Sequence, residues 1–109
     1  MEKMKEGWYE AQPDEAKAHF DAHPDALILD VREPDEFASG HIANAKNVPL
    51  QTVLAQQESL GGLPKDQEIW VYCRSGRRSQ FAAHHLASLG YTRAINFQGV
   101  LQWPYGLVK

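Results

Sequence analysis

Apolar residues occur in short blocks along the chain, and glycines, prolines and polar residues separate one block from the next. Continuous or β-branched apolar runs predict strands, which we place at 8–10, 26–31, 46–48, 68–72 and 93–97. Helical spacing with a proline or glycine boundary predicts helices from Pro13 to just before Pro24, at 33–38, from Leu50 to about Ser59, from Ser79 to Leu89 and after Gly99. This alternation predicts an α/β fold, with a mostly parallel central sheet flanked by helices on both faces.

The length and charge of the chain narrow the class of protein further. Its 109 residues suffice for one domain, and no repeat or low-complexity linker divides them, so we expect a single domain over 1–109. The net charge is −3, which disfavours nucleic acid and anionic membranes as partners. No apolar run approaches the ~20 residues that span a bilayer, and the start has no apolar signal region. We therefore expect a cytoplasmic protein.

Chemistry concentrates in the segment 73–79, which joins the clearest strand to a helix. Cys73 is the only cysteine, which excludes an intrachain disulfide and a multi-cysteine zinc site. Three arginines follow it within six residues of a chain that is acidic overall: Arg74, Arg77 and Arg78. This local reversal of charge indicates that an anion meets the loop. In a mostly parallel sheet, the reactive site lies off the carboxyl ends of the strands, where Cys73 stands.

Three effects favour the thiolate form of Cys73. A helix N-terminus and nearby guanidinium groups both lower the pKa of a thiol. The small residues Ser75 and Gly76 allow successive backbone N–H groups to turn inward as an anion-binding nest. A lone cysteine is often a simple buried residue, and an arginine-rich turn is often a solvated surface. Here position and charge coincide, so we interpret Cys73 as a nucleophile in a cradle that holds an anion against its sulfur.

Two long motifs resemble the rhodanese domain family. The first comprises Leu29–Phe37, Gly40–Ile42, Ala45 and Asn47–Leu50, and the second comprises Val71–Ser79, Ala82, Ala83, Leu86, Gly90 and Tyr91. The resemblance covers about 8–105. One departure lies near the C-terminus, where the family often has two adjacent glycines and this chain has only Gly99 before Trp103. It concerns the local backbone path more than the chemistry.

The resemblance implies a small single-domain sulfurtransferase that needs no cofactor. Cys73 would attack a sulfane sulfur, become a persulfide and pass the sulfur to a thiophilic acceptor such as cyanide or a thiol. The substrate-binding residues would be those of the following loop: Arg74, Ser75, Gly76, Arg77, Arg78 and Ser79. The donor would be thiosulfate or a related small anion, and a protein sulfur donor or acceptor is a further class of partner.

The first motif suggests structural roles. Asp30 ends a strand and Arg32 lies two residues later, so we expect both to join one internal polar network, with support of the active site as a further role. Gly40 suits the end of a short helix, and we expect His41 to anchor the next turn by a hydrogen bond rather than to act as a general base.

Other functions are possible on the same residues. A cysteine-dependent phosphatase or arsenate reductase would need Cys-x5-Arg, whereas Cys73 and Arg78 give Cys-x4-Arg, a ring one residue too short for phosphate. A regulatory module of the same fold would commonly lack the loop cysteine. A relay that takes persulfide sulfur from a protein donor remains open, and it would show weak turnover of thiosulfate.

Histidines and aromatic residues suggest a metal site and a surface for stacking nucleic-acid bases, and we expect neither. His19 and His23 are four residues apart on an expected helix, but no third metal ligand is evident, so we expect no metal site. The adjacent His84 and His85 point in different directions on a helix. The remaining aromatic residues suit core packing better than base stacking: Trp8, Trp70, Tyr72, Phe97 and Trp103.

Overall fold

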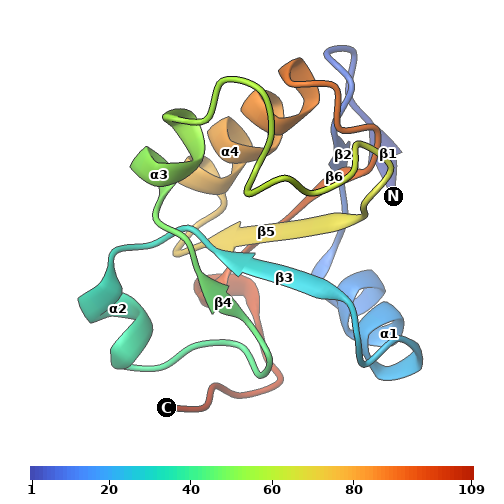
Figure 1. Ribbon diagram of the computed structural model, residues 1–109. Coiled ribbons are helices and arrows are strands. Elements are labelled where there is room, and N and C mark those ends of the chain that lie inside the picture. Colours follow the sequence, from blue (N-terminus) through green and yellow to red (C-terminus); the bar gives the residue numbers. More distant parts are fainter.

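The most apolar segments of the chain form the centre of one sheet. The computed structural model describes residues 1–109 and contains six strands, ordered β1-β2-β6-β5-β3-β4 (Figure 1). Their bounds are Glu2–Lys3 (β1), Tyr9–Glu10 (β2), Leu27–Asp30 (β3), Lys46–Asn47 (β4), Ile69–Cys73 (β5) and Ala94–Gly99 (β6). Every pair of neighbouring strands is parallel except β1 and β2. The fold class expected from the sequence is confirmed.

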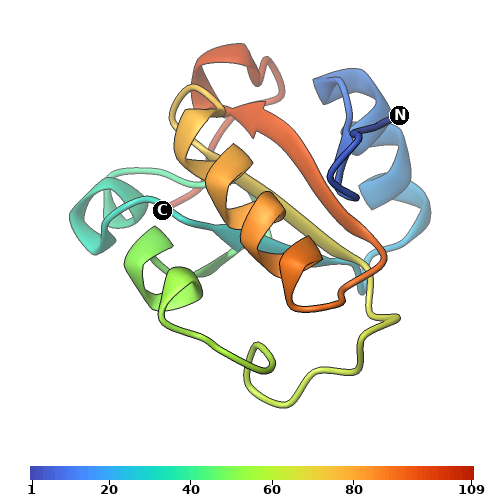
Figure 2. The same cartoon turned by 90° about the horizontal axis from the view of Figure 1, so that it is seen from above.

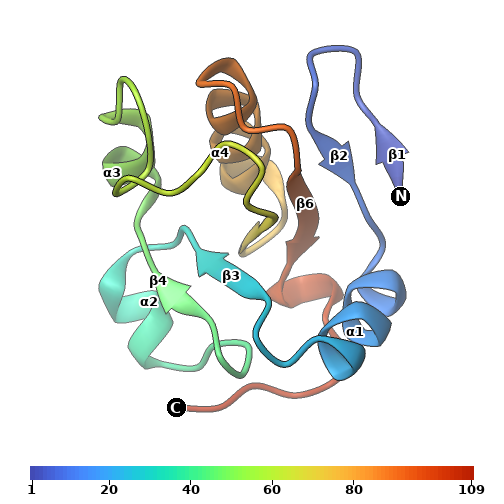
Figure 3. The same cartoon turned by 45° about the vertical axis from the view of Figure 1, so that its right-hand side comes forward.

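Helices cover the sheet on both sides. They are Pro13–Ala22 (α1), Pro34–Ala38 (α2), Leu50–Leu54 (α3) and Arg77–Ser88 (α4), with a 3-10 turn at Val100–Gln102. Figure 2 shows α4 running along the sheet with α3 beside it, and Figure 3 shows α1 on the other side of the sheet and α2 next to β4. Pro13 and Pro34 each occupy a first helical position, where the missing N–H costs nothing.

Alternation along β5 divides the core into two layers. Ile69, Val71 and Cys73 belong to the cluster under α3 and α4. Trp70 and Tyr72 point the other way and pack in a second cluster. Because strand side chains alternate between the two faces, the last residue of β5 necessarily faces α4. Burial in these clusters confirms core packing for Trp8, Trp70, Tyr72 and Phe97, while Trp103 is half-buried beside the second cluster.

Two predicted helix boundaries were wrong and one strand was missed, each for a local reason. The third helix ends at Leu54 instead of about Ser59, because 55–58 is mostly polar and offers no further apolar residue to bury. The helix after Cys73 begins at Arg77, two residues early, because Gly76 adopts a φ of 99° and starts it there. The antiparallel β1 was missed because both of its residues are charged and exposed. No helix of the structure has the length and apolarity needed to cross a membrane.

Candidate active site

Cys73 is the last residue of β5, at the carboxyl end of the parallel sheet. It pairs with Gly99 of β6, and the register between these strands shifts between Val71 and Cys73. The chain then turns through 74–76, and α4 begins at Arg77. The sulfur therefore lies where the sequence places a reactive group, below the start of a long helix.

Hydrogen-bond donors converge on the sulfur. The backbone N–H of Gly76 donates to Cys73 Sγ at 3.1 Å, and that of Ser79 reaches it at 3.5 Å. The Ser79 hydroxyl oxygen is 3.4 Å from Sγ. Burial raises the pKa of the Cys73 thiol, but the Ser79 hydroxyl and the amides of Ser79, Gly76 and Ser75 outweigh it, so its pKa lies below the ordinary value. The loop is built to stabilise a thiolate.

The loop closes over the sulfur. Cys73 is only 1% exposed, and none of the cavities in the structure is lined by it. The loop amides point at Sγ, and the binding of an anion between them and the sulfur stays a prediction. A donor atom reaches the sulfur only if the overlying loop moves outward.

Close backbone packing holds the loop at its base. A Cβ on Gly99 would lie 2.2 Å from the carbonyl oxygen of Arg74, so only glycine fits there. The Leu101 N–H donates to the same carbonyl at 3.0 Å. Gly76 has a φ of 99°, and its Cβ would meet Gln98 Cα at 3.0 Å. Gly99, which stands where the family often has two glycines, is thus required by its close approach to the loop.

The three arginines of the loop have different surroundings. Arg74 and Arg77 are exposed and have no ion-pair partner. Arg78 instead forms a two-pronged ion pair with Glu36 of α2, with N–O distances of 2.7 and 3.0 Å. The Arg78 guanidinium lowers the pKa of Glu36 to about 2, and the Glu33 N–H also contributes. Arg78 therefore has a partner inside the chain, and the ion pair ties the start of α4 to α2. Sequence reasoning did not identify Glu36 as this partner.

Ser79 is fully buried and belongs to a polar cluster that the sequence did not suggest. Its hydroxyl donates to Asn96 Oδ1 at 2.7 Å, and the Asn96 amide nitrogen faces the Glu10 carboxylate at 3.1 and 3.2 Å. Asn96 lies on β6 among apolar residues. A polar residue inside an otherwise apolar strand was the available signal, since such groups need buried partners.

Asp30 and Arg32 form the predicted internal network. Arg32 donates from Nε to Asp30 Oδ1 at 3.0 Å and from Nη2 to Oδ2 at 2.6 Å, and both residues are buried. Arg32 Nη2 also donates to the Gly40 carbonyl at 2.7 Å. Burial and hydrogen bonding to Asp30 raise the pKa of nearby Tyr72, so its phenol stays protonated. This pair ties β3 to the end of α2, and it lies across the sheet from Cys73.

His41 anchors its turn as expected. Its Nδ1 lies 3.1 Å from the Phe37 carbonyl oxygen, and its ring stacks on Phe37 at 3.8 Å between centroids. Gly40 follows the last residues of α2 with a φ of 148°.

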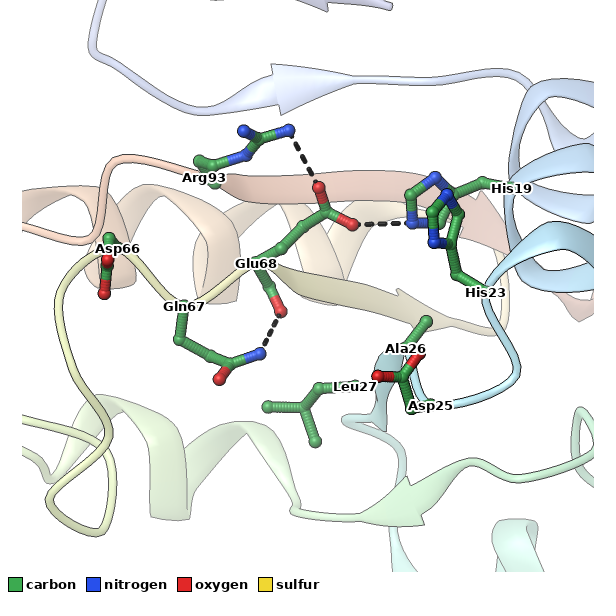
Figure 4. Close-up of a pocket in the computed structure, with 9 residues that line it drawn as sticks. All are labelled: His19, His23, Asp25, Ala26, Leu27, Asp66, Gln67, Glu68 and Arg93. Carbon is green, nitrogen blue, oxygen red and sulfur yellow. Dashed lines mark hydrogen bonds and ion pairs between the residues drawn. The ribbon is translucent and has the colours of Figure 1, made fainter.

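A polar hollow of about 270 Å³ lies at the amino ends of β3 and β5, away from Cys73. Figure 4 shows Glu68 between His19 and Arg93, at 2.6 and 2.9 Å. The His19 ring also stacks on that of His23, with 4.4 Å between centroids. No group of three or more metal-ligating side chains gathers here or elsewhere in the chain.

An α/β domain whose loop lowers the pKa of a thiol at the end of a parallel strand has features that domains with a cysteine nucleophile share. Comparison with known proteins narrows that class. The model of the rhodanese-like domain matches residues 12–103. The chain therefore belongs to the rhodanese-like sulfurtransferase family.

Individual relatives agree with this assignment. The chain is 36% identical over 80 residues to a sulfurtransferase of Allochromatium vinosum, covering 72% of each chain. It is 34% identical over 73 residues to the thiosulfate sulfurtransferase PspE of Escherichia coli, covering 66% of this chain and 68% of that one. The structure of a rhodanese-like domain protein from Staphylococcus aureus superimposes with a TM-score of 0.78 at 28% identity, covering 92% and 96%.

Some relatives are much longer than this chain. The putative sulfur carrier protein YrkF of Bacillus subtilis is 34% identical over 88 residues, which are 80% of this chain but only 46% of that protein. The relatives thus include proteins named as sulfurtransferases and one named as a putative sulfur carrier.

Proposed function

We propose that the protein transfers a sulfane sulfur from thiosulfate, or a related persulfide donor, through a persulfide on Cys73. The thiolate attacks the outer sulfur of thiosulfate, the S–S bond of the donor breaks, and sulfite leaves with the electron pair. Cyanide or a thiolate acceptor then attacks the terminal sulfur, and Cys73 Sγ leaves as the thiolate. The observation that carries this proposal is the convergence of loop donors on a sulfur whose pKa they lower.

The same donors serve both half-reactions. In the first, the amides of Gly76 and Ser79 favour the attacking thiolate. In the second, negative charge returns to Sγ as the S–S bond breaks, and preorganised N–H groups stabilise that developing charge. Because the loop closes on Sγ, both steps require it to open far enough to admit one sulfur atom.

Arg74 and Arg77 are the cations free to attract the donor. Thiosulfate is a dianion, and both guanidinium groups are exposed at the mouth of the loop without a carboxylate partner. Arg78 is held by Glu36, and the spacing from Cys73 to Arg78 gives a ring one residue too short for a phosphoryl group. This arrangement favours sulfur transfer over phosphate-ester hydrolysis. A chain that works as a thiolate suits a reducing compartment, and we place it in the cytoplasm.

A protein sulfur donor or acceptor is a second candidate, favoured by the surface around the loop. Phe81 and Leu101 are each 59% exposed, the largest exposed fractions among the large apolar side chains of the chain. Phe81 lies one helical turn after Arg77 on α4, and Leu101 is hydrogen-bonded through its N–H to the Arg74 carbonyl. Exposed apolar and cationic side chains therefore lie on the segments next to the Cys73 loop, which suits an acidic protein that presents a thiol or persulfide.

Parallel assays test the proposal. The purified chain is given thiosulfate and cyanide, with release of sulfite and thiocyanate as the readout, and separately an aryl phosphate. We expect equimolar sulfite and thiocyanate and no phosphate release. Phosphate release without sulfite would overturn the proposal. Slow thiosulfate turnover, together with rapid uptake of sulfur from a persulfide-bearing protein that Phe81→Ser abolishes, would select the relay.

A further inference from the structure

The Ser79 hydroxyl has one proton and three acceptors within reach. Its oxygen lies 2.7 Å from Asn96 Oδ1, 3.3 Å from the Gln98 carbonyl oxygen and 3.4 Å from Cys73 Sγ. A hydroxyl donates only one hydrogen bond at a time, so it cannot serve the sulfur and Asn96 together. In this conformation the distances assign the proton to Asn96.

The orientation of the Asn96 amide is fixed by its other partners. Its Nδ2 faces only acceptors, namely both carboxylate oxygens of Glu10 and the Gly76 carbonyl oxygen at 3.2 Å. Glu10 is itself held by a hydrogen bond of 2.7 Å from Trp8 Nε1. Turning the amide over would set Oδ1 against these oxygens. Oδ1 must therefore face Ser79, and Asn96 is 3% exposed, so water does not replace it.

We propose that Asn96 is a positioning residue that competes with Cys73 for the Ser79 hydroxyl, holding it while the sulfur is neutral and releasing it when the thiolate forms. The inference deepens the proposed function, since it assigns a role within the same site. A neutral thiol or the inner sulfur of a persulfide is a weak acceptor, and the amide oxygen then keeps the proton. A thiolate is a charged acceptor, and a charge-assisted hydrogen bond outweighs a neutral one.

When the Ser79 hydroxyl turns from Asn96 to the sulfur, no buried polar atom loses its last hydrogen bond, so the exchange costs little free energy. Asn96 Oδ1 also accepts the Gln98 N–H at 3.2 Å, so it retains a partner after the hydroxyl turns away. The movement is a rotation about one C–O bond and needs no displacement of the backbone. The hydroxyl therefore turns toward Sγ in each half-reaction when negative charge is on that atom, and returns to Asn96 once the persulfide has formed.

Two charged groups face this cluster and must be held constant in any test. Arg78 on α4 is close enough to Cys73 for each charge to favour the other, and it is paired with Glu36. Glu10 on β2 contacts Asn96 directly. Variants that keep the charges of Arg78, its partner Glu36 and Glu10 isolate the effect of the hydroxyl.

The test is the pH dependence of alkylation of the only cysteine by iodoacetamide, which reports the thiolate of Cys73 alone. Four proteins are compared: the unmodified chain, Ser79→Ala, Asn96→Ala and the double variant. We expect Ser79→Ala to raise the pKa of Cys73 and Asn96→Ala to lower it, each by about half a unit, as loss or gain of one ordinary hydrogen bond implies. In the Ser79→Ala background, Asn96→Ala should have no effect.

The double variant distinguishes competition for the Ser79 hydroxyl from mere structural support of the loop by Asn96. If Asn96 merely supports the loop, its removal shifts the pKa equally with or without Ser79, and the proposal is overturned. An unchanged or raised pKa in Asn96→Ala alone also overturns it. If Asn96→Ala fails to fold by circular dichroism, Asn96→Val, which suits a strand and lacks the oxygen, takes its place. Alkylation involves no sulfur transfer, so failure of the proposed function would leave this result readable.

Discussion

Two buried polar groups lie on opposite faces of the same sheet, and they differ in how completely their hydrogen bonds are fixed. Asp30 and Arg32 form a pair in which each carboxylate oxygen accepts from the guanidinium. Around Cys73, by contrast, one hydroxyl proton is shared among three acceptors. A saturated network fixes a structure, whereas a network with one proton to move can respond to a change of charge.

The Asp30–Arg32 network is connected to the cluster around Cys73 through one ion pair, Arg78 with Glu36. Arg32 holds the end of α2 through the Gly40 carbonyl, and α2 carries Glu36, which holds Arg78 at the start of α4. The start of α4, which follows the Cys73 loop, is therefore tied to α2, the helix next to β4. The contrast leads to four predictions, which run from the largest expected effect to the smallest.

Replacing the sulfur should remove the chemistry and leave the fold. We expect Cys73→Ser to lower sulfite release from thiosulfate by roughly 1,000-fold or more, because a serine hydroxyl is not ionised at neutral pH. Its circular dichroism and urea midpoint should match those of the unmodified chain within error. Retained turnover in this variant would show that another group forms the sulfur intermediate.

Removing the charge partner from the saturated network should act on stability first. Arg32→Ala leaves Asp30 charged and buried, so we expect the free energy of unfolding to fall by about 3–5 kcal/mol. Urea denaturation measures it. Arg93→Ala is the matched control, since the Arg93–Glu68 pair is more exposed and should be worth about 0–1 kcal/mol. Equal losses in the two variants would contradict the distinction between fixed and exposed pairs.

The free arginines of the loop should affect donor binding alone. Arg74→Ala and Arg77→Ala should each raise the KM for thiosulfate several-fold, because each removes one exposed cation from the mouth of the loop. The free energy of unfolding should change by less than about 0.5 kcal/mol. Higher ionic strength should reduce the difference from the unmodified chain, and a KM unchanged in both variants would exclude these residues from donor binding.

The ion pair between the two regions should give a small, pH-dependent effect. The pKa of Glu36 is about 2 when folded and lies near 4.5 when unfolded, so its contribution to stability is complete above about pH 4.5 and is lost as the pH falls toward 2. Both side chains are partly exposed, so we expect Glu36→Gln to cost at most about 1 kcal/mol at pH 7. Urea titrations at pH 7 and pH 3 should show that difference shrinking, whereas a constant difference would contradict it.

The sequence was most informative where local chemistry decides structure. Pro13 and Pro34 marked two helix starts, and the apolar run before Cys73 marked the central strand and the position of the thiol. It could not reveal that Glu36 pairs with Arg78 or that Asn96 contacts Ser79, because these partners are 42 and 17 residues apart and meet only in the fold. The closed loop was also hidden, since it depends on the approach of Gly99 to the Arg74 carbonyl.

Intact-mass spectrometry after exposure to thiosulfate tests the role of Cys73 most directly. We predict that the unmodified chain gains one sulfur atom, about 32 Da, and that cyanide removes it, because covalent catalysis requires such an intermediate. The Cys73→Ser protein should gain nothing under the same conditions. An unmodified chain that keeps its original mass while releasing sulfite, or a Cys73→Ser chain that gains the sulfur, would contradict a persulfide on Cys73.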